Sequence, residues 1–306
     1  MSVAQVPAQG NDHIAELTRL TQRLHINNRF ALGVIWTVTT LVALGFIAII
    51  IFLIARGITY LLDPAFYNAS LSGIGPEMFN TFYILILTEL FLFPVSLAAA
   101  IYLVEYARQG PLVTGIHFAA ETLAGVPSLV LGLFGVLAFS DLLGLHTSRL
   151  AGALTLLCLN LPLALRLFED ALVSVPRDLH EGGLALGATR WHMIRTVVLP
   201  SALPGLVTGL ILSAGKIVGE AAALLFTMGL NNPSNVFTLD PTIASDTLTT
   251  HLYFLAGPGA GSTSLTRAQE TAITAGSATL LIVILLVINL AARSIGRAIQ
   301  RRITAA

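Results

Sequence analysis

Four ionisable residues lie inside apolar stretches of the chain that are long enough to cross a membrane. Lys216 and Glu220 are four residues apart in one stretch, and Glu89 and Glu121 lie in two others. A charge at the centre of a bilayer costs about 2.5–3.5 kcal/mol on insertion scales, so each of these groups needs a compensating role. Together they predict a polar path through the membrane, in which a cation at depth meets an anion in transit.

A purely structural role is the alternative for the same residues. Residues four apart share one helix face, so Lys216 and Glu220 could be a self-neutralising pair that eases insertion. The favourable order for such a pair places glutamate first, whereas here lysine comes first. That difference is worth roughly 0.2–0.5 kcal/mol and favours the path only slightly. Glu89 and Glu121 remain open to a role as buried glutamates satisfied by neighbouring helices.

Charges are most frequent in the segment 175–200, V-P-R-D-L-H-E-G-G-L-A-L-G-A-T-R-W-H-M-I-R-T-V-V-L-P. Pro176 suits the first position of a helix, and Gly187 suits the left-handed residue that ends one. Thr189 can cap a second short helix, which Pro200 is expected to end because it has no N–H group. The segment therefore predicts a helix, a glycine turn and a second helix.

Two other functions are compatible with a helix, a turn and a second helix. A DNA-binding helix-turn-helix is disfavoured because Asp178 and Glu181 dilute the basic residues and both flanks enter the membrane, so we expect no nucleic-acid partner. An amphipathic helix lying at the membrane surface is the second alternative.

The composition indicates which elements position these groups. The chain has 306 residues, of which 55% are hydrophobic and only 10% charged, and its mean hydropathy is +0.83. Soluble domains carry about 25% charged residues. We therefore expect an all-α membrane protein with one transmembrane domain over residues 33–292. Six segments reach the length of about 20 apolar residues that a bilayer requires: 33–55, 79–104, 116–139, 149–168, 203–228 and 272–292.

Arginine placement predicts the orientation of these segments, since cytoplasmic loops carry an excess of positive charge. With the N-terminus inside, twelve arginines fall on the inner side and three on the outer side. Both termini are therefore expected in the cytoplasm. The polar N-terminal tail, 1–32, is either a helix on the membrane surface or a solvated tail, and the C-terminal tail, 293–306, is basic. The outer loop 229–270 either meets a solute-binding protein or covers the bundle.

Several kinds of chemistry have no motif in the chain. There is no phosphate-binding G-x-x-x-x-G-K-[ST] run, since Gly215-Lys216 is followed by Ile217 inside an apolar segment. His180-Glu181 is not followed by a second histidine at helical spacing, as zinc proteases require. With one cysteine, Cys158, and scattered histidines, we expect no metal site and no catalytic residues. Any energy source must lie in another chain.

By spacing, the charged segment resembles the E-A-A…G…I-x-L-P loop of ABC importer permeases. The matching residues are Glu181, Gly182, Gly183, Gly187, Leu199 and Pro200. The resemblance implies that this loop forms coupling helices that dock into a groove on a cytoplasmic ATPase. Two glycines replace the usual alanine pair, and each lowers helix propensity by about 1 kcal/mol.

Further motifs resemble the PstA-type permease of the phosphate ABC importer, over roughly residues 81–292. They are A-A-A-I-Y-L-V-E-Y-A at 98–107, L-A-G-V-P-S at 123–128 with G-L-F-G at 132–135, and G-E-A-A-A-L-L at 219–225. In that family an arginine usually stands where this chain has Lys216, and a threonine and a proline where it has Ala221 and Ala223. Lysine keeps the charge but lacks the bidentate fork of arginine.

The resemblance implies a type I ABC importer permease in a bacterial inner membrane. It further implies a PstC-like sister permease, a PstB-like ATPase dimer that binds ATP and Mg, and an extracytoplasmic phosphate-binding protein. The chain itself is expected to bind no cofactor. The alternatives are an importer of another oxyanion (sulfate, molybdate or tungstate), an ion-coupled secondary transporter that uses Lys216 and Glu220 as a relay, and, more remotely, a membrane enzyme.

Overall fold

The computed structural model describes residues 9–70, 73–185, 187–230, 237–259, 261 and 265–304, and within these ranges the regular structure is entirely helical. The chain forms two units, Met1–Ile54 and Ala55–Ala306, which are described separately. The first unit holds most of α1 (Gln9–Leu61), a single helix whose apolar part begins at Ala31. The backbone of residues 9–32, expected to be a separate tail, is therefore continuous with the first apolar helix.

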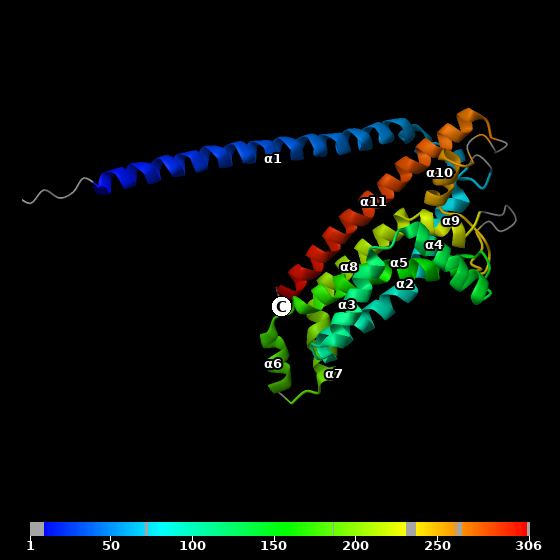
Figure 1. Ribbon diagram of the computed structural model, residues 1–306. Helices are drawn as coiled ribbons and strands as arrows, with labels where there is room; N and C mark the ends of the chain where they lie inside the picture. Colours follow the sequence, from blue (N-terminus) through cyan, green and yellow to red (C-terminus); the bar gives the residue numbers. More distant parts are fainter. Residues whose placement is uncertain are drawn as a thin grey trace, which may run out of the picture. The chain divides into compact units, whose positions relative to one another are not determined.

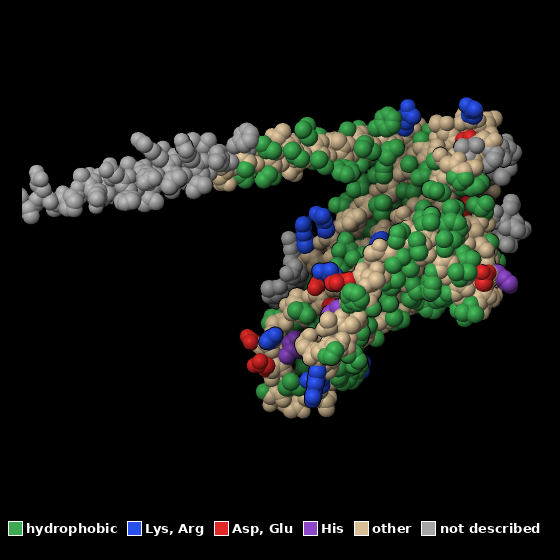
Figure 2. All heavy atoms as spheres, viewed as in Figure 1, with side chains coloured by type: hydrophobic (Ala, Val, Ile, Leu, Met, Phe, Trp, Pro, Cys, Tyr) green, Lys and Arg blue, Asp and Glu red, His purple; other side chains and the backbone are tan. Residues whose placement is uncertain are grey.

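Four long helices form the body of the second unit: α2 (Gly75–Ile101), α5 (Arg149–Val173), α8 (Leu199–Gly219) and α11 (Arg267–Thr304) (Figure 1). Buried apolar side chains such as Leu92, Leu156 and Phe168 fill the space between them. Figure 2 shows hydrophobic side chains over the flank of this bundle, with charged and histidine side chains gathered at the end that carries α6 and α7. An apolar flank between polar ends suits a bundle that spans a membrane.

Five helices in the described part of the chain are long and apolar enough to cross a membrane, and a bent pair makes a sixth. The bent pair is α3 (Pro111–Ala124) followed by α4 (Ser128–Gly135), which continues through a π-helical turn, η3 (Val136–Leu142). The two halves meet at 101°. The apolar segment expected over 116–139 is therefore present as a bent pair of helices. Pro127 explains the break, because a proline disfavours helical geometry at the residue before it and supplies no N–H group.

The fifth expected segment, 203–228, is also broken. Helix α8 ends at Gly219, Glu220 has extended backbone angles (φ −79°, ψ 131°), and a short helix, α9 (Ala222–Thr227), follows. Glu220 Oε1 accepts a hydrogen bond from the N–H of Ala223 at 3.3 Å, near the start of α9. The prediction that Lys216 and Glu220 share a helix face is therefore wrong, because the helix ends between them.

The loop between α5 and α8 contains the two expected short helices, α6 (Arg177–Ala185) and α7 (Arg190–Met193). Gly187 has φ +81°, which confirms the predicted left-handed residue. The capping role predicted for Thr189 is confirmed, since its side chain accepts a hydrogen bond from the N–H of His192.

Pro200 does not end the second helix, contrary to the expectation. A π-helical turn, η4 (Ile194–Val198), follows α7 and leads directly into α8, so Arg190–Gly219 is one continuous span. Pro200 occupies the first turn of α8. The backbone hydrogen bonds change from the π to the α pattern at this point. The N–H group that Pro200 lacks would therefore have no required partner in the first turn of α8, and the helix continues.

The opposite end of the bundle is closed by the segment between α9 and α11. It contains α10 (Leu248–Ala256), whose Leu248 and Leu255 are buried, so this segment packs on the rest of the second unit. Phe66 of a 3₁₀ turn, η1 (Pro64–Tyr67), belongs to the same hydrophobic cluster as Leu248 and Leu255.

Arg149 is completely buried at the start of α5. Its guanidinium donates a hydrogen bond to Ser245 Oγ at 2.9 Å and another to the carbonyl oxygen of Thr238.

Candidate functional site

A cavity of about 450 Å³ lies between α3, α5 and α8. Two of the four predicted path residues line it, Glu121 from α3 and Lys216 from α8. Arg166 and Glu169 of α5 line it as well, together with His117 one turn before Glu121. The structure therefore brings Lys216 and Glu121 together at one polar cavity, although they lie 95 positions apart in the sequence.

The cavity carries charges of both signs. Lys216 and Arg166 are exposed on this chain, and Lys216 Nζ lies 3.5 Å from the carbonyl oxygen of Leu159, which is a weak contact. His117 Nε2 lies 3.1 Å from Glu169 Oε1. The ammonium group of Lys216 is thus not neutralised by an ion pair within the described part of the chain and is available to an anion.

Glu89 and Glu220, the other two predicted path residues, do not line this cavity. Glu89 Oε1 accepts a hydrogen bond from Ser213 Oγ at 2.6 Å, so it joins α2 to α8 one turn before Lys216. Glu220 interacts with the start of α9, as described above. Both glutamates therefore have local partners. For Glu89, this is consistent with the alternative that it is a buried glutamate satisfied by a neighbouring helix.

A second groove, of about 520 Å³, lies beside α6. Glu181 lines it and is exposed, as a docking residue must be. His117, Glu169 and Asp170 line both this groove and the Lys216 cavity. The two hollows are therefore adjacent, and three side chains connect the surface beside α6 with the cavity inside the bundle.

The two short helices, α6 and α7, each contact the π-helical turn η2 (Tyr102–Tyr106), which extends α2. His180 Nε2 of α6 lies 3.0 Å from Glu105 Oε1, and the guanidinium of Arg190 lies 5.7 Å from the ring centre of Tyr106. These contacts were not expected from the sequence. The only local signal was that Glu105 and Tyr106 end an apolar run with polar side chains.

The remaining predicted coupling residues fall into two groups. Gly182 is exposed, and a Cβ atom there would meet nothing within 4 Å, whereas one at Gly183 would lie 2.8 Å from Met193 Cγ. Gly183 therefore lets α6 pack on α7, and Gly182 leaves open surface. Leu199 packs against the core and Pro200 is exposed at the start of α8.

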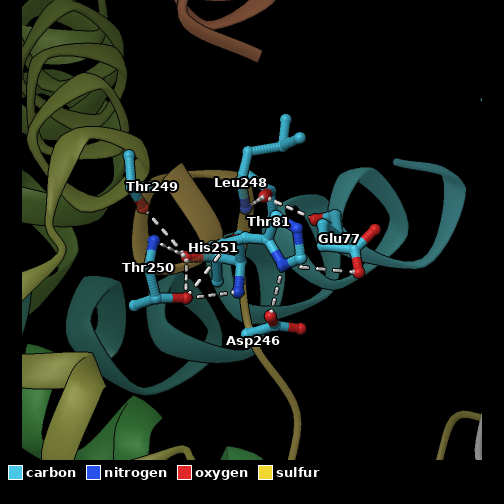
Figure 3. Close-up of polar contacts among 8 residues, drawn as sticks. Glu77, Thr81, Asp246, Leu248, Thr249, Thr250 and His251 are labelled. Carbon is cyan, nitrogen blue, oxygen red and sulfur yellow. Dashed lines mark hydrogen bonds and ion pairs between the residues drawn. The ribbon is translucent and has the colours of Figure 1, made fainter. Parts of the chain in front are cut away.

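A further cluster was missed by the sequence analysis, which predicted no metal site. Glu77, Asp246 and His251 meet at the end of the bundle that carries α10 (Figure 3). Burial by itself lowers the pKa of His251, but the hydrogen bond and charge of Asp246 and the charge of Glu77 outweigh it, and the pKa is raised. The only local signal was the spacing of Asp246 and His251, five residues apart.

Known proteins resemble this chain over most of its length. It is 35% identical over 295 residues to the "Probable ABC transporter permease protein YqgI" of Bacillus subtilis, covering 92% of this chain and 98% of that protein. It is 32% identical over 294 residues to the "Phosphate transport system permease protein PstA 1" of Mycobacterium tuberculosis, covering 92% and 93% of the two chains.

Solved structures share the fold at lower identity. A subunit of the MetNI methionine ABC transporter aligns with a TM-score of 0.54 and 21% identity, over 74% of this chain and 94% of its own. A chain of a bacterial alginate ABC transporter aligns with a TM-score of 0.57 and 18% identity, over 75% and 80% of the two chains. Both confirm the expected type I ABC importer permease fold.

The family of binding-protein-dependent transport system inner membrane components matches residues 92–305, which include the bent α3–α4 pair, the Lys216 cavity and the α6–α7 loop. Proteins of this family are the membrane subunits of ABC transporters and are not themselves the ATPase. The chain belongs to this family and is a permease subunit of an ABC importer.

Proposed function

We propose that this permease imports inorganic phosphate and that the Lys216 cavity is part of the path the anion takes. The observation that carries the proposal is the position of Lys216, a cation without an ion-pair partner in the described part of the chain, in a cavity within a membrane-spanning bundle. An anion that leaves water for such a site needs a fixed positive charge to replace its hydration. Several relatives named as phosphate permeases support the choice of anion.

The mixed charge of the cavity favours phosphate over sulfate. Lys216 and Arg166 can donate hydrogen bonds to the oxygens of an anion, while Glu121 and Glu169 can only accept them when ionised. Phosphate near neutral pH still carries a P–OH group, which donates to a carboxylate. Sulfate and molybdate carry no such hydrogen, so the same carboxylates repel them.

The loop containing α6 and α7 is proposed to receive the motion of the ATPase. Glu181 and Gly182 are exposed for docking, and the groove beside α6 adjoins the Lys216 cavity through His117, Glu169 and Asp170. A shift of α6 would therefore act directly on side chains of the path. In this proposal ATP and Mg bind to a PstB-like ATPase dimer, and this chain supplies no catalytic residue.

The remaining parts of the assembly follow from the same proposal. A PstC-like sister permease covers the open face on which Lys216 and Arg166 are exposed. An extracytoplasmic phosphate-binding protein delivers the anion at the end of the bundle that carries α10, and both termini of the permease lie in the cytoplasm of a bacterial cell. An ion-coupled secondary transporter is excluded by membership of an ABC transporter family.

Uptake by the reconstituted complex tests this function. The permease is purified with the partners that accompany it and placed in vesicles with the binding protein outside and ATP inside. ATP-dependent accumulation of labelled phosphate, not reduced by an excess of sulfate or molybdate, is the expected result. Uptake of sulfate, molybdate or tungstate in place of phosphate would establish the other-oxyanion alternative and overturn the proposal.

A further inference from the structure

Glu77, Asp246 and His251 come from two elements that lie far apart in the sequence (Figure 3). Glu77 is in the first turn of α2, Asp246 directly precedes the N-cap of α10, and His251 lies one turn into α10. Glu77 and Asp246 are buried, with exposed fractions of 6% and 2%. His251 Nδ1 lies 2.9 Å from Asp246 Oδ2 and 3.8 Å from Glu77 Oε1. One imidazole nitrogen therefore faces two buried carboxylates.

We propose that these three residues bind a divalent first-row transition metal ion, for which zinc is the representative. One donor atom from each residue lies within 4.8 Å of the others. Zinc binds imidazole nitrogen and carboxylate oxygen at about 2.0–2.2 Å, so ligand atoms around it are roughly 3–4 Å apart. The distances from His251 Nδ1 to the two carboxylates, 2.9 and 3.8 Å, are close to that spacing before any adjustment.

Asp246 supplies an independent reason for a cation. Its Oδ1 is buried and has no hydrogen-bond partner within the described ranges. Buried polar atoms are normally satisfied, so this oxygen calls for a ligand. A protonated His251 would donate a hydrogen bond to Oδ2 only and would offset the charge of one carboxylate. A divalent ion would offset the charges of both carboxylates, and it can bind a carboxylate through one or both oxygens.

The donor set selects the kind of ion. Magnesium and calcium prefer oxygen ligands alone, and magnesium usually keeps several waters. An imidazole nitrogen favours zinc and its transition-metal neighbours. The mixture of one nitrogen with two carboxylates also leaves a coordination position for water, as in three-residue zinc sites.

The surrounding hydrogen bonds indicate what the ion stabilises. Thr81 Oγ1 donates to the carbonyl of Glu77 and accepts the N–H of Leu248 at 3.0 Å, which joins α2 to the start of α10. Thr249 Oγ1 donates to the carbonyl of Glu220 at 2.8 Å. A metal ion bound by Glu77, Asp246 and His251 therefore fixes α10 to α2, and through Thr249 it also positions the break between α8 and α9.

Metal content of the purified full chain tests the proposal. The protein is treated with a chelator, dialysed against zinc chloride with excess magnesium, freed of unbound metal and analysed for zinc by mass spectrometry. The parent is expected to retain one zinc ion per chain and to gain thermal stability from it. Asp246→Asn and His251→Gln are each expected to lose that ion and the gain, with affinity at least tenfold weaker.

His180→Gln is the matched control, because His180 also contacts a carboxylate, Glu105, at 3.0 Å but forms an ion pair with no second carboxylate among the described residues. It should retain zinc like the parent. Each variant is compared only as a monodisperse sample, and Glu77→Gln replaces any variant that aggregates. A parent that retains no zinc, or equal zinc in the parent, Asp246→Asn and His251→Gln, would overturn the proposal.

Discussion

His180 Nε2 lies 3.0 Å from Glu105 Oε1, and this contact joins α6, a largely exposed helix, to η2, the π-helical turn that extends α2. Side-chain exposure is 22% for His180 and 7% for Glu105, so the contact is largely shielded from water. No side chain of α6 is fully buried. The position of this helix therefore depends on a small number of contacts, of which this is the most specific.

Glu105→Gln is expected to loosen α6 without unfolding the bundle. The substitution removes a charged acceptor and costs about 1 kcal/mol locally, as for a single hydrogen bond. In the reconstituted complex, we expect ATP hydrolysis to continue while transport per ATP falls. Glu181→Gln, on the exposed side of the same helix, should instead weaken ATPase association. A normal ratio of transport to hydrolysis in Glu105→Gln would argue against a positioning role for this contact.

Gly187→Val is expected to disturb the turn between α6 and α7. Gly187 has φ +81°, and a β-branched residue in that region costs about 1–3 kcal/mol. The variant should still insert, but should copurify with less ATPase. Gly115→Ala in α3, outside the α6–α7 loop, is the matched control, since its Cβ would also meet nothing within 4 Å and alanine raises helix propensity by about 1 kcal/mol. Equal ATPase recovery from the two variants would contradict this account of the turn.

Gly205→Ala is expected to destabilise the packing of α8 on α5. A Cβ atom at Gly205 would lie 2.7 Å from Ala171 Cβ, so this glycine lets the two helices approach closely. The extra methyl carbon overpacks this contact, which lowers the free energy of unfolding by about 1–3 kcal/mol. At Gly215 on the same helix, the nearest atom is 4.0 Å away, so Gly215→Ala should be neutral or stabilising. Thermal unfolding in detergent compares them, and a lower midpoint for Gly215→Ala would contradict the packing.

Cysteine labelling in a Cys158→Ser background tests the orientation of the bundle. Gln109 lines the groove beside α6, and Thr266 immediately precedes α11 at the other end of the bundle. Because the arginine distribution predicts that α6 lies on the cytoplasmic side, Gln109→Cys should react only after the membrane is permeabilised. Thr266→Cys should react in intact spheroplasts. The reverse pattern would invert the proposed topology.

Local signals explain why much of the fold could be predicted from the sequence. Apolar length identified the helices that are able to span the membrane, and Gly187 and Thr189 act through their own backbone geometry and a neighbouring N–H group. The breaks were harder to predict. Pro127 and Pro200 look alike in sequence, yet the first bends the chain by 101° and the second is accommodated after a π-helical turn.

The candidate site was only partly predictable because it depends on which helices meet. Lys216 and Glu121 were identified by the cost of charge in an apolar segment, and that argument gives no partner for either. Glu220 was placed one helical turn from Lys216, but the helix ends before it. Glu77 and His251 lie 174 positions apart, so no local pattern could show that they meet.

Phosphate uptake by Lys216 variants in the assembled complex tests the central claim most directly. Because Glu220 interacts with α9 and not with Lys216, Lys216→Met removes the charge without leaving an ion pair broken. We expect this variant to assemble with its partners and bind the ATPase normally, yet to import phosphate at least tenfold more slowly, while Lys216→Arg retains uptake. Parental uptake by a fully assembled Lys216→Met complex would contradict the assignment of this cavity to the anion path.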